Sequence, residues 1–314
     1  MKKRNLIIIY RGQRYRDDFD EISKTVIRFA PEITVYHLPA SLRADLPVSA
    51  WQYPTLTVAL LGKFNFKPRR GPVLVSEAVG KLMQQRILRE HGIPTPPAEL
   101  FRFGMTIDPI KFGEFVLLKP MDGRFQSRGL GINVFRRARA EQLTPASFPP
   151  DHPIFRDREG YILQKFVHTG ENPMTFRVAT FLGEVLYSAR YRSKTASPDL
   201  TSHDAVIEAG DFTQKHEKTI TFEYEDDVLA LARKVAVAFY HFPLLGIDFV
   251  RDVKSSKLYV LEVNPGGNTW HFSSAMWEDR RRQNPQLVSD MKSQFGAFDR
   301  AAEALVKKTR LIAS

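Results

Sequence analysis

Apolar runs near the start of the chain alternate with an amphipathic stretch, a pattern typical of strands joined through a helix. Residues 5–10 are almost entirely apolar and predict a buried strand. Residues 17–29 have helical spacing, and strand-like runs follow at 33–38 and 54–61. A strand, a helix and a second strand of these lengths form a βαβ unit. The pattern therefore predicts a small parallel sheet at the N-terminus.

Glycine and proline mark the breaks in the rest of the chain. Residues 63–72 are rich in Lys, Arg, Gly and Pro and read as a linker. A helix is predicted over 77–91, with Ser76 as its N-cap and Gly92 with the prolines that follow as its end. The remaining predicted elements are strands at 115–119 and 161–167, a hairpin turning at Gly183-Glu184, and helices at 226–239 and 295–312.

The most informative pattern is a predicted hairpin of strands 245–250 and 257–263. Alternation places Glu262 and Asn264 on one face, and Asp248 lies in the partner strand. Two carboxylates and an amide oxygen form the hard donor set that Mg²⁺ prefers. The alternative is that these are ordinary solvent-facing positions of a half-buried strand. An acid and an amide at the end of an apolar run favour the metal site, because acids are depleted in strands and seldom buried alone.

Composition narrows the class of protein. The 314 residues, 43% of them hydrophobic, are enough for two or three domains. The absence of cysteine excludes disulfides, cysteine-bound zinc and thiol catalysis, and it fits a reducing compartment. The basic and then apolar start is too short for a signal peptide, and no segment approaches membrane length. We therefore expect a cytoplasmic protein without a membrane partner.

The net charge of +11 has two interpretations, a nucleic-acid surface or a preference for anionic small molecules. The basic residues are scattered in short groups, and no zinc finger, RNA-recognition aromatic motif or basic heptad accompanies them. We therefore expect no nucleic-acid partner. The basic loop 11–14 follows the first strand, where open α/β sheets bind ligands, but it lacks the G-x-G-x-x-G fingerprint. The sequence favours a scaffold role for this loop.

The run Gly-Ile-Asp, a hairpin, and then Leu-Glu-Val-Asn-Pro-Gly resembles the metal-binding hairpin of the ATP-grasp superfamily. The resemblance is closest to the branch of ribosomal-protein glutamate ligase, glutathione synthetase and D-alanine–D-alanine ligase. Further motifs follow in the family's order over nearly the whole chain. The resemblance implies a mixed α/β ATP-grasp fold with a Rossmann-like N-terminal domain at 1–75, a small lid domain at 76–166 and a large C-terminal domain at 167–314.

The same resemblance implies a set of nucleotide contacts. Lysines at the places of Lys81 and Lys119 contact ATP, and a glycine-rich loop closes over the triphosphate. A hinge segment holds adenine through its backbone, although Lys165 stands where the family usually has glutamate. Glu171 is the candidate for the ribose hydroxyls, with a solvated loop acid as the alternative. The loop and hinge residues implied are Gly123, Ser127, Gly129, Gly131, Gln164, Lys165, Phe166 and Val167.

By resemblance, Asp248, Glu262 and Asn264 hold Mg²⁺, with Mn²⁺ as a second choice. Arg177 and Arg190, expected on one face of their hairpin, bind the substrate carboxylate and the transferring phosphoryl group. The implied enzyme is an ATP-dependent carboxylate–amine ligase that forms an amide through an acyl phosphate and releases ADP and phosphate. Its partners are small carboxylates and amines such as amino acids or peptides, and relatives are often homo-oligomers.

Three alternatives remain at this stage. An ATP-grasp kinase would leave the phosphate on its product, and a non-catalytic module would bind nucleotide without releasing ADP. A nucleic-acid-binding protein would show a steep salt dependence. Residues 195–212 lack the Asn-x-x-Arg-Gly-Gly run of glutamate ligases, so the acceptor chemistry is not carried over. Trp270, His271 and Phe272 are expected to form a pocket wall, with catalytic base as a second role for His271.

Overall fold

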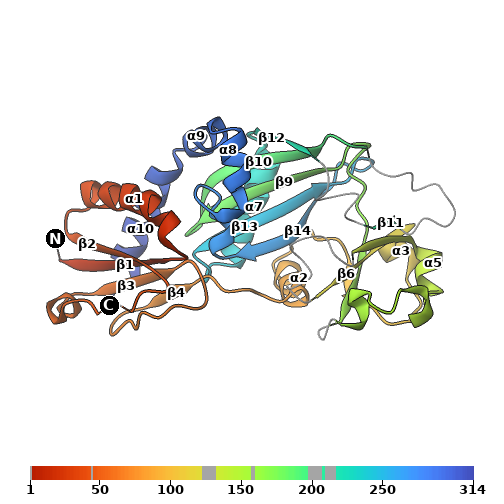
Figure 1. Ribbon diagram of the computed structural model, residues 1–314, viewed down its shortest axis with the longest axis horizontal. Helices are drawn as coiled ribbons and strands as arrows, with labels where there is room; N and C mark the ends of the chain where they lie inside the picture. Colours follow the sequence, from red (N-terminus) through yellow and green to blue (C-terminus); the bar gives the residue numbers. More distant parts are fainter. Residues whose placement is uncertain (1, 44, 122–131, 157–159, 197–206, 209–216) are drawn as a thin grey trace.

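The computed structural model describes residues 2–43, 45–121, 132–156, 160–196, 207–208 and 217–314. Three sheets follow one another along the long axis of the molecule (Figure 1). A parallel sheet contains the N-terminus, a larger antiparallel sheet occupies the centre, and a small sheet lies at the far end. None of the helices in the described ranges has the length and apolar composition needed to cross a bilayer.

The N-terminal sheet confirms the predicted βαβ unit. All its pairings are parallel, in the order β2-β1-β3-β4. The strands are β1 (Arg4–Tyr10), β2 (Ile33–Pro39), β3 (Thr55–Ala59) and β4 (Val73–Val75). Helix α1 (Arg16–Phe29) connects β1 to β2.

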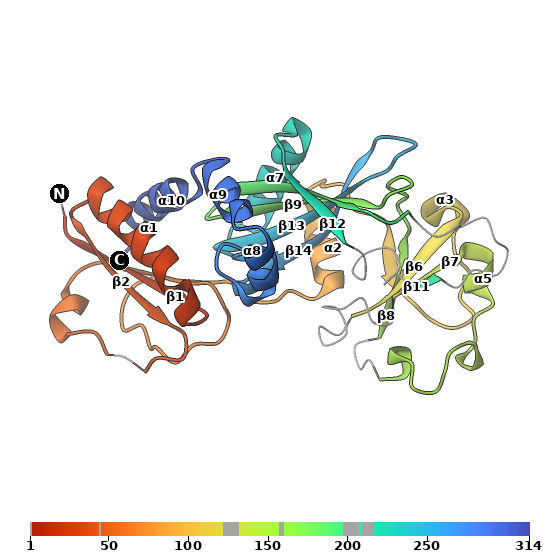
Figure 2. The same cartoon turned by 45° about the horizontal axis from the view of Figure 1, so that its top comes forward.

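The last helix, α10 (Ala297–Ile312), returns to this sheet and packs beside α1, as both views show (Figure 2). The predicted closing helix is confirmed, and it buries one face, because Ala301 and Leu305 are fully buried in one core with Phe19 and Ile22 of α1. The backbone N–H of Thr55 also donates to the carbonyl of Ser314 at 3.1 Å. The C-terminal helix therefore packs as part of the N-terminal α/β domain.

The central sheet has the order β12-β10-β9-β13-β14 and is antiparallel throughout. Helix α7 (Asp226–Ala238) covers one face, where Val228 and Val235 share a core with Ile247 and Phe249. Two short helices, α8 (Glu278–Gln283) and α9 (Gln286–Ser293), lead to α10. The strands are β9 (Met174–Phe181), β10 (Glu184–Ser193), β12 (Lys218–Phe222), β13 (Leu244–Arg251) and β14 (Leu258–Pro265).

The small sheet has the order β11-β7-β6-β8-β5. Its core is formed by Phe112, Leu118, Phe135 and Leu163. Helices α3 (Pro109–Phe112) and α5 (Arg137–Glu141) pack in this part of the chain. The strands are β5 (Ala98–Leu100), β6 (Phe115–Pro120), β7 (Asn133–Arg136), β8 (Tyr161–Lys165) and β11 (Ile207–Glu208).

Helix α2 (Lys81–Glu90) begins four residues later than predicted, and Ser76 is not its N-cap. Gly80 occupies that position, while the Ser76 hydroxyl accepts a hydrogen bond from the backbone N–H of Leu244 at 3.1 Å. The serine therefore ties the end of β4 to the central sheet. Leu88 of α2 packs in the α7 core, so this helix contacts the large domain although it was predicted to open the lid domain. The boundaries at 75 and 166 stay predictions.

The loop after β14 is anchored in the N-terminal core by Trp270. This side chain is 1% exposed, stacks on Phe19 at 4.9 Å between ring centroids, and donates from Nε1 to Asp18 Oδ2 at 2.8 Å. Trp270→Phe keeps most of the packing and leaves the buried Asp18 without this donor. We expect a loss of about 1–3 kcal/mol in the free energy of unfolding, measured by urea denaturation.

Trp51→Phe is the matched control for this prediction. The indole nitrogen of Trp51 is buried and has no hydrogen-bond partner within the described residues. Its replacement should therefore change the free energy of unfolding much less. Equal losses in the two variants would show that the Trp270–Asp18 bond adds nothing to stability.

Candidate functional site

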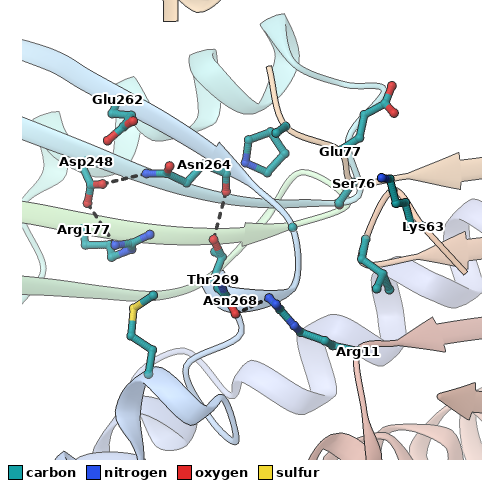
Figure 3. A pocket seen from close by; sticks show the side chains of 16 residues that line it. Arg11, Lys63, Ser76, Glu77, Arg177, Asp248, Glu262, Asn264, Asn268 and Thr269 are labelled. Atoms are coloured by element: carbon teal, nitrogen blue, oxygen red, sulfur yellow. Dashed lines mark hydrogen bonds and ion pairs between the residues drawn. The ribbon is translucent and has the colours of Figure 1, made fainter. Parts of the chain in front are cut away.

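The β13–β14 hairpin gathers the three predicted metal ligands. Asp248 lies opposite Glu262, and Gly246 lies opposite Asn264. Asn264 Nδ2 donates to Asp248 Oδ2 at 3.0 Å (Figure 3). The side chains of Ile247 and Val263 point into the α7 core, so the alternating polar positions occupy the other face of the sheet. The predicted grouping of the three side chains is therefore confirmed, whereas their role as metal ligands stays a prediction.

Arg177 on β9 completes this polar group. It lies opposite Asp248 in the neighbouring strand, with Nη1 at 3.5 Å from Asp248 Oδ1, and the two side chains are 18% and 22% exposed. Burial raises the pKa of Asp248 to about 6, although the Arg177 charge opposes the shift. Glu262 adds a second negative charge that raises the same pKa. The two carboxylates would therefore be stabilised by a further cation.

Gly246 provides the space in which the Arg177 guanidinium lies. A β-carbon at this position would come within 2.7 Å of Arg177 Nη2 and within 2.7 Å of Thr269 Cγ2. Thr269 is itself held in place, because its hydroxyl donates to the carbonyl of Asn264 at 3.0 Å. A larger residue at position 246 would therefore displace the arginine or the loop after β14.

Given the catalytic role that the sequence resemblance implies for Arg177, we expect Gly246→Ala to lower the turnover number about 10–100-fold while the protein stays folded, because small displacements of a catalytic group are costly. Both crowded atoms are ends of side chains that can move aside. The measurement is ADP release at saturating substrates, with the melting temperature as a check on folding. Gly12→Ala is the control, since a β-carbon at Gly12 meets nothing within 4 Å. An unaffected turnover number in Gly246→Ala would mean that Arg177 need not occupy its observed place.

Two buried lysines lie beside this group. Lys81 is 8% exposed and its Nζ donates to the carbonyl of Pro120 at 3.0 Å, while Lys119 is 7% exposed. Burial and the charge of Lys81 lower the pKa of Lys119 to about 7, and the charge of Glu262 opposes this shift. Lys81 is therefore not a solvated surface lysine of its helix. A buried lysine whose pKa is lowered by a second lysine favours an anionic ligand, because a bound anion would stabilise its ammonium form.

One hydrogen bond ties α2 to the β13–β14 hairpin. The side-chain Oε1 of Gln84 accepts from the backbone N–H of Val263 at 3.0 Å. Val263 stands between Glu262 and Asn264 in β14, so the start of α2 with Lys81 is fixed near these two residues.

The predicted adenine hinge has a buried, unsatisfied side chain. Gln164 on β8 is fully buried, and neither of its amide atoms has a partner within the described residues. The N–H groups of Lys165 and Phe166 already donate to the carbonyls of Pro97 and Phe115. A base bound here would therefore have to use other groups of this segment, which includes the buried Val167.

The other predicted nucleotide contacts are less defined. Glu171 is exposed and makes no hydrogen bond or ion pair within the described part of the chain, so its ribose contact stays a prediction. The loop residues Gly123, Ser127, Gly129 and Gly131 lie outside the described residues.

Arg190 does not share a face with Arg177, and the expectation that it would is wrong. Arg177 lies opposite Ala189, and Arg190 lies opposite Phe176, whose ring is in the α7 core. The cause is an irregularity between Val185 and Tyr187, which shifts the register of the hairpin by one residue. Such a shift moves every later side chain to the opposite face. Arg190 instead forms an ion pair with Glu223.

A cleft of about 720 Å³ opens beside the β13–β14 hairpin. Residues of the N-terminal domain, among them Arg11 and Lys63, form one of its walls, and sequence reasoning did not identify these two residues as part of the site (Figure 3). Arg11, in the loop interpreted as scaffold, donates from Nη1 to Asn268 Oδ1 at 2.5 Å. The available signal was its place after the first strand of a parallel sheet. The charged and amide side chains that line the cleft are those of Arg11, Lys63, Glu77, Arg177, Asp248, Glu262, Asn264 and Asn268.

The expected pocket wall of Trp270, His271 and Phe272 is also wrong. None of the three lines this cleft, and all are buried in the protein core. His271 Nδ1 lies 2.6 Å from the Tyr187 hydroxyl, and its ring stacks on Trp277. Burial, with the charges of nearby arginines, holds the pKa of His271 well below its usual value. Because the ring is buried in the core and does not line the cleft, it has no access to a substrate proton there, which argues against a role as catalytic base.

No protein-family model matches the chain, and no curated protein matches it in sequence. Solved structures do match along nearly its whole length. D-cycloserine synthetase DcsG is 16% identical with a TM-score of 0.53, covering 97% of this chain and 99% of that one. A Chryseobacterium gregarium RiPP-associated ATP-grasp ligase, in complex with ADP and with a leader and core peptide, is 13% identical with a TM-score of 0.54, covering 98% and 97%.

A third structure, ATP-grasp ligase PsnB complexed with minimal precursor, Mg and ADP, is 12% identical with a TM-score of 0.50. The match covers 97% of this chain and 98% of that one. Identities this low carry information on architecture alone. Together with the observed three-sheet arrangement, they show that this chain has the mixed α/β ATP-grasp fold.

Proposed function

We propose that this protein is an ATP-dependent carboxylate–amine ligase, which forms an amide bond through an acyl-phosphate intermediate. One observation carries the proposal: within the ATP-grasp fold, an oxygen-rich hairpin and a buried arginine line one cleft, and two buried lysines lie near the same hairpin. The groups concerned are Asp248, Glu262, Asn264, Arg177, Lys81 and Lys119.

The lysines and the buried glutamine fit a nucleotide. Lys81 and Lys119 are two buried lysines, and bound phosphates would offset the burial and the mutual repulsion that lower the pKa of Lys119. The unsatisfied amide of Gln164 can both donate and accept, as recognition of a purine edge requires. We therefore assign the region between α2 and β6 to the phosphates and the end of β8 to the base.

The hairpin fits a magnesium ion. Asp248, Glu262 and the amide oxygen of Asn264 offer oxygen donors, which Mg²⁺ prefers over nitrogen or sulfur. The pKa of Asp248 is raised by burial and by the charge of Glu262, so a bound cation would stabilise its ionised form. The described residues contain no group of three or more His, Cys, Asp or Glu side chains placed to hold a metal ion, so the third protein donor proposed here is the amide of Asn264. Bound here, Mg²⁺ would neutralise phosphate charge during transfer.

The proposed reaction has two balanced steps. An oxygen of the substrate carboxylate attacks the γ-phosphorus of ATP, the bond from this phosphorus to the β–γ bridging oxygen breaks, and ADP leaves with that oxygen. The amine nitrogen of the second substrate then attacks the acyl carbon, loses a proton, and displaces phosphate to give the amide. Arg177 would steady the transferring phosphoryl group, because its fixed charge and planar fork suit a dispersed negative charge.

The direct test is ADP release from ATP and Mg²⁺ in the presence of pairs of carboxylates and amines, amino acids and peptides first. Products are identified by mass spectrometry. We expect ADP release that requires both substrates and a product lighter by one water than their sum. A product that keeps the phosphate would identify a kinase, and nucleotide binding without ADP release under any pair would identify a non-catalytic module.

Lys119→Met should weaken MgADP binding about tenfold or more, because one buried phosphate contact disappears. The same change should raise the melting temperature without nucleotide, since it removes a buried charge beside Lys81. Both effects are read from thermal melts with and without MgADP. Lys111→Met is the control, since Lys111 belongs to the same domain and forms a surface ion pair with Glu99 at 2.8 Å. Unchanged MgADP affinity in Lys119→Met would remove this lysine from the nucleotide site.

A further inference from the structure

The wall of the cleft that faces the β13–β14 hairpin carries two cationic side chains of the N-terminal domain, Arg11 and Lys63. Arg11 follows β1 and Lys63 follows β3, so both stand at the carboxyl ends of neighbouring parallel strands. A second hollow of about 670 Å³ along this edge is lined by the same two residues. They therefore stand where the two hollows meet.

Neither cation is neutralised within the described part of the chain. Arg11 contacts only the neutral amide oxygen of Asn268, and Lys63 makes no ion pair or hydrogen bond there. By contrast, Arg14 of the same loop pairs with Glu278 at 3.2 Å. Charges that face a cleft without a counter-ion favour an anionic ligand, because they raise its local concentration and fix its orientation.

Arg11 and Lys63 lie across the cleft from the β13–β14 hairpin, and this position determines which part of a bound substrate they would contact. Arg177 and the three oxygen ligands line the opposite side of the same cleft. On the proposed function, the reacting carboxylate lies on that side. A group that reaches Arg11 and Lys63 must then belong to the remote end of the same substrate.

Resting on that function, we propose that Arg11 and Lys63 bind a second carboxylate of the acid substrate, remote from the one that is phosphorylated. The substrate class is therefore a dicarboxylate such as an acidic amino acid or a peptide of one. Glu77, also on this wall and without an ion pair in the described residues, favours a neighbouring ammonium group. Its negative charge also disfavours a dianionic phosphate at the same place.

The test is calorimetric titration of the full chain with both enantiomers of aspartate and glutamate and with their monoamides, in the presence of Mg²⁺ and a non-hydrolysable ATP analogue. We expect at least one dicarboxylate to bind about tenfold more tightly than its monoamides, the value of one charge-assisted contact. The double variant Arg11→Gln/Lys63→Gln should lose this preference.

The matched control is Arg14→Gln/Lys67→Gln, which removes the same net charge outside the cleft and should keep the preference. The proposal would be overturned if no dicarboxylate binds, or if the monoamides bind the wild type as tightly as the dicarboxylates. It would also be overturned if the preference for the dicarboxylate survives in Arg11→Gln/Lys63→Gln. Titration with the ATP analogue alone separates the two hypotheses. If the analogue binds but no preference for dicarboxylates is seen, only the proposed site for a second carboxylate is excluded. If the analogue does not bind, the result counts against the proposed ligase function.

Discussion

Glu262→Ala is expected to lower ATP-dependent ADP release about 10²–10³-fold while the protein stays folded, the usual effect of removing one group that stabilises transferring charge. Glu262 is the carboxylate that connects the two halves of the site. It lies opposite Asp248 in the hairpin, and its charge acts on both Asp248 and the buried Lys119. Its loss should therefore weaken the cation site and the phosphate site together.

The measurement is steady-state ADP release over a range of Mg²⁺ concentrations. If Glu262 is a metal ligand, the variant should need more Mg²⁺ to reach half of its own maximal rate. Glu184→Ala is the control, because Glu184 is an exposed acid at the turn of the β9–β10 hairpin. A Glu262→Ala protein with the wild-type rate and magnesium dependence would exclude this residue as a ligand.

Local pattern was enough to predict the hairpin and the grouping of its polar residues. Side chains in strands alternate, so Glu262 and Asn264 share a face whatever the rest of the protein does. The partner strand was close in sequence, which left few possible registers for Asp248. The buried strand β1 and the closing helix α10 were recognised for the same reason, since each buries a face that its own sequence defines.

The errors arose where long-range contacts decide the structure. One irregularity in β10 moved Arg190 to the α7 face, and a bulge of this kind has no clear signature in the sequence. Ser76 looked like an N-cap, but its hydroxyl is used by Leu244, 168 residues away. Arg11 faces the cleft because the N-terminal sheet packs beside the loop after β14. Motifs near one another in the chain could not reveal that packing.

Arg177→Met is expected to lower the turnover number about 10³-fold with little change in MgADP affinity. The guanidinium lies beside Asp248 on the side of the cleft that faces the N-terminal domain, whereas the lysines assigned to phosphate belong to α2 and β6. A group that acts on the transferring phosphoryl should affect the rate and leave nucleotide binding nearly intact. Arg177→Lys keeps the charge without the planar fork, so its loss should be smaller.

The second arginine of the same hairpin gives the sharpest comparison. Arg190→Met changes the same residue type on the adjacent strand, but its ion pair with Glu223 lies on the α7 face. We expect turnover within a few-fold of wild type, together with some loss of stability from the unpaired Glu223. Melting temperatures of both variants separate loss of structure from loss of chemistry. Equal losses of turnover in Arg177→Met and Arg190→Met would contradict the assignment, because only Arg177 shares a face with Asp248 and the cleft.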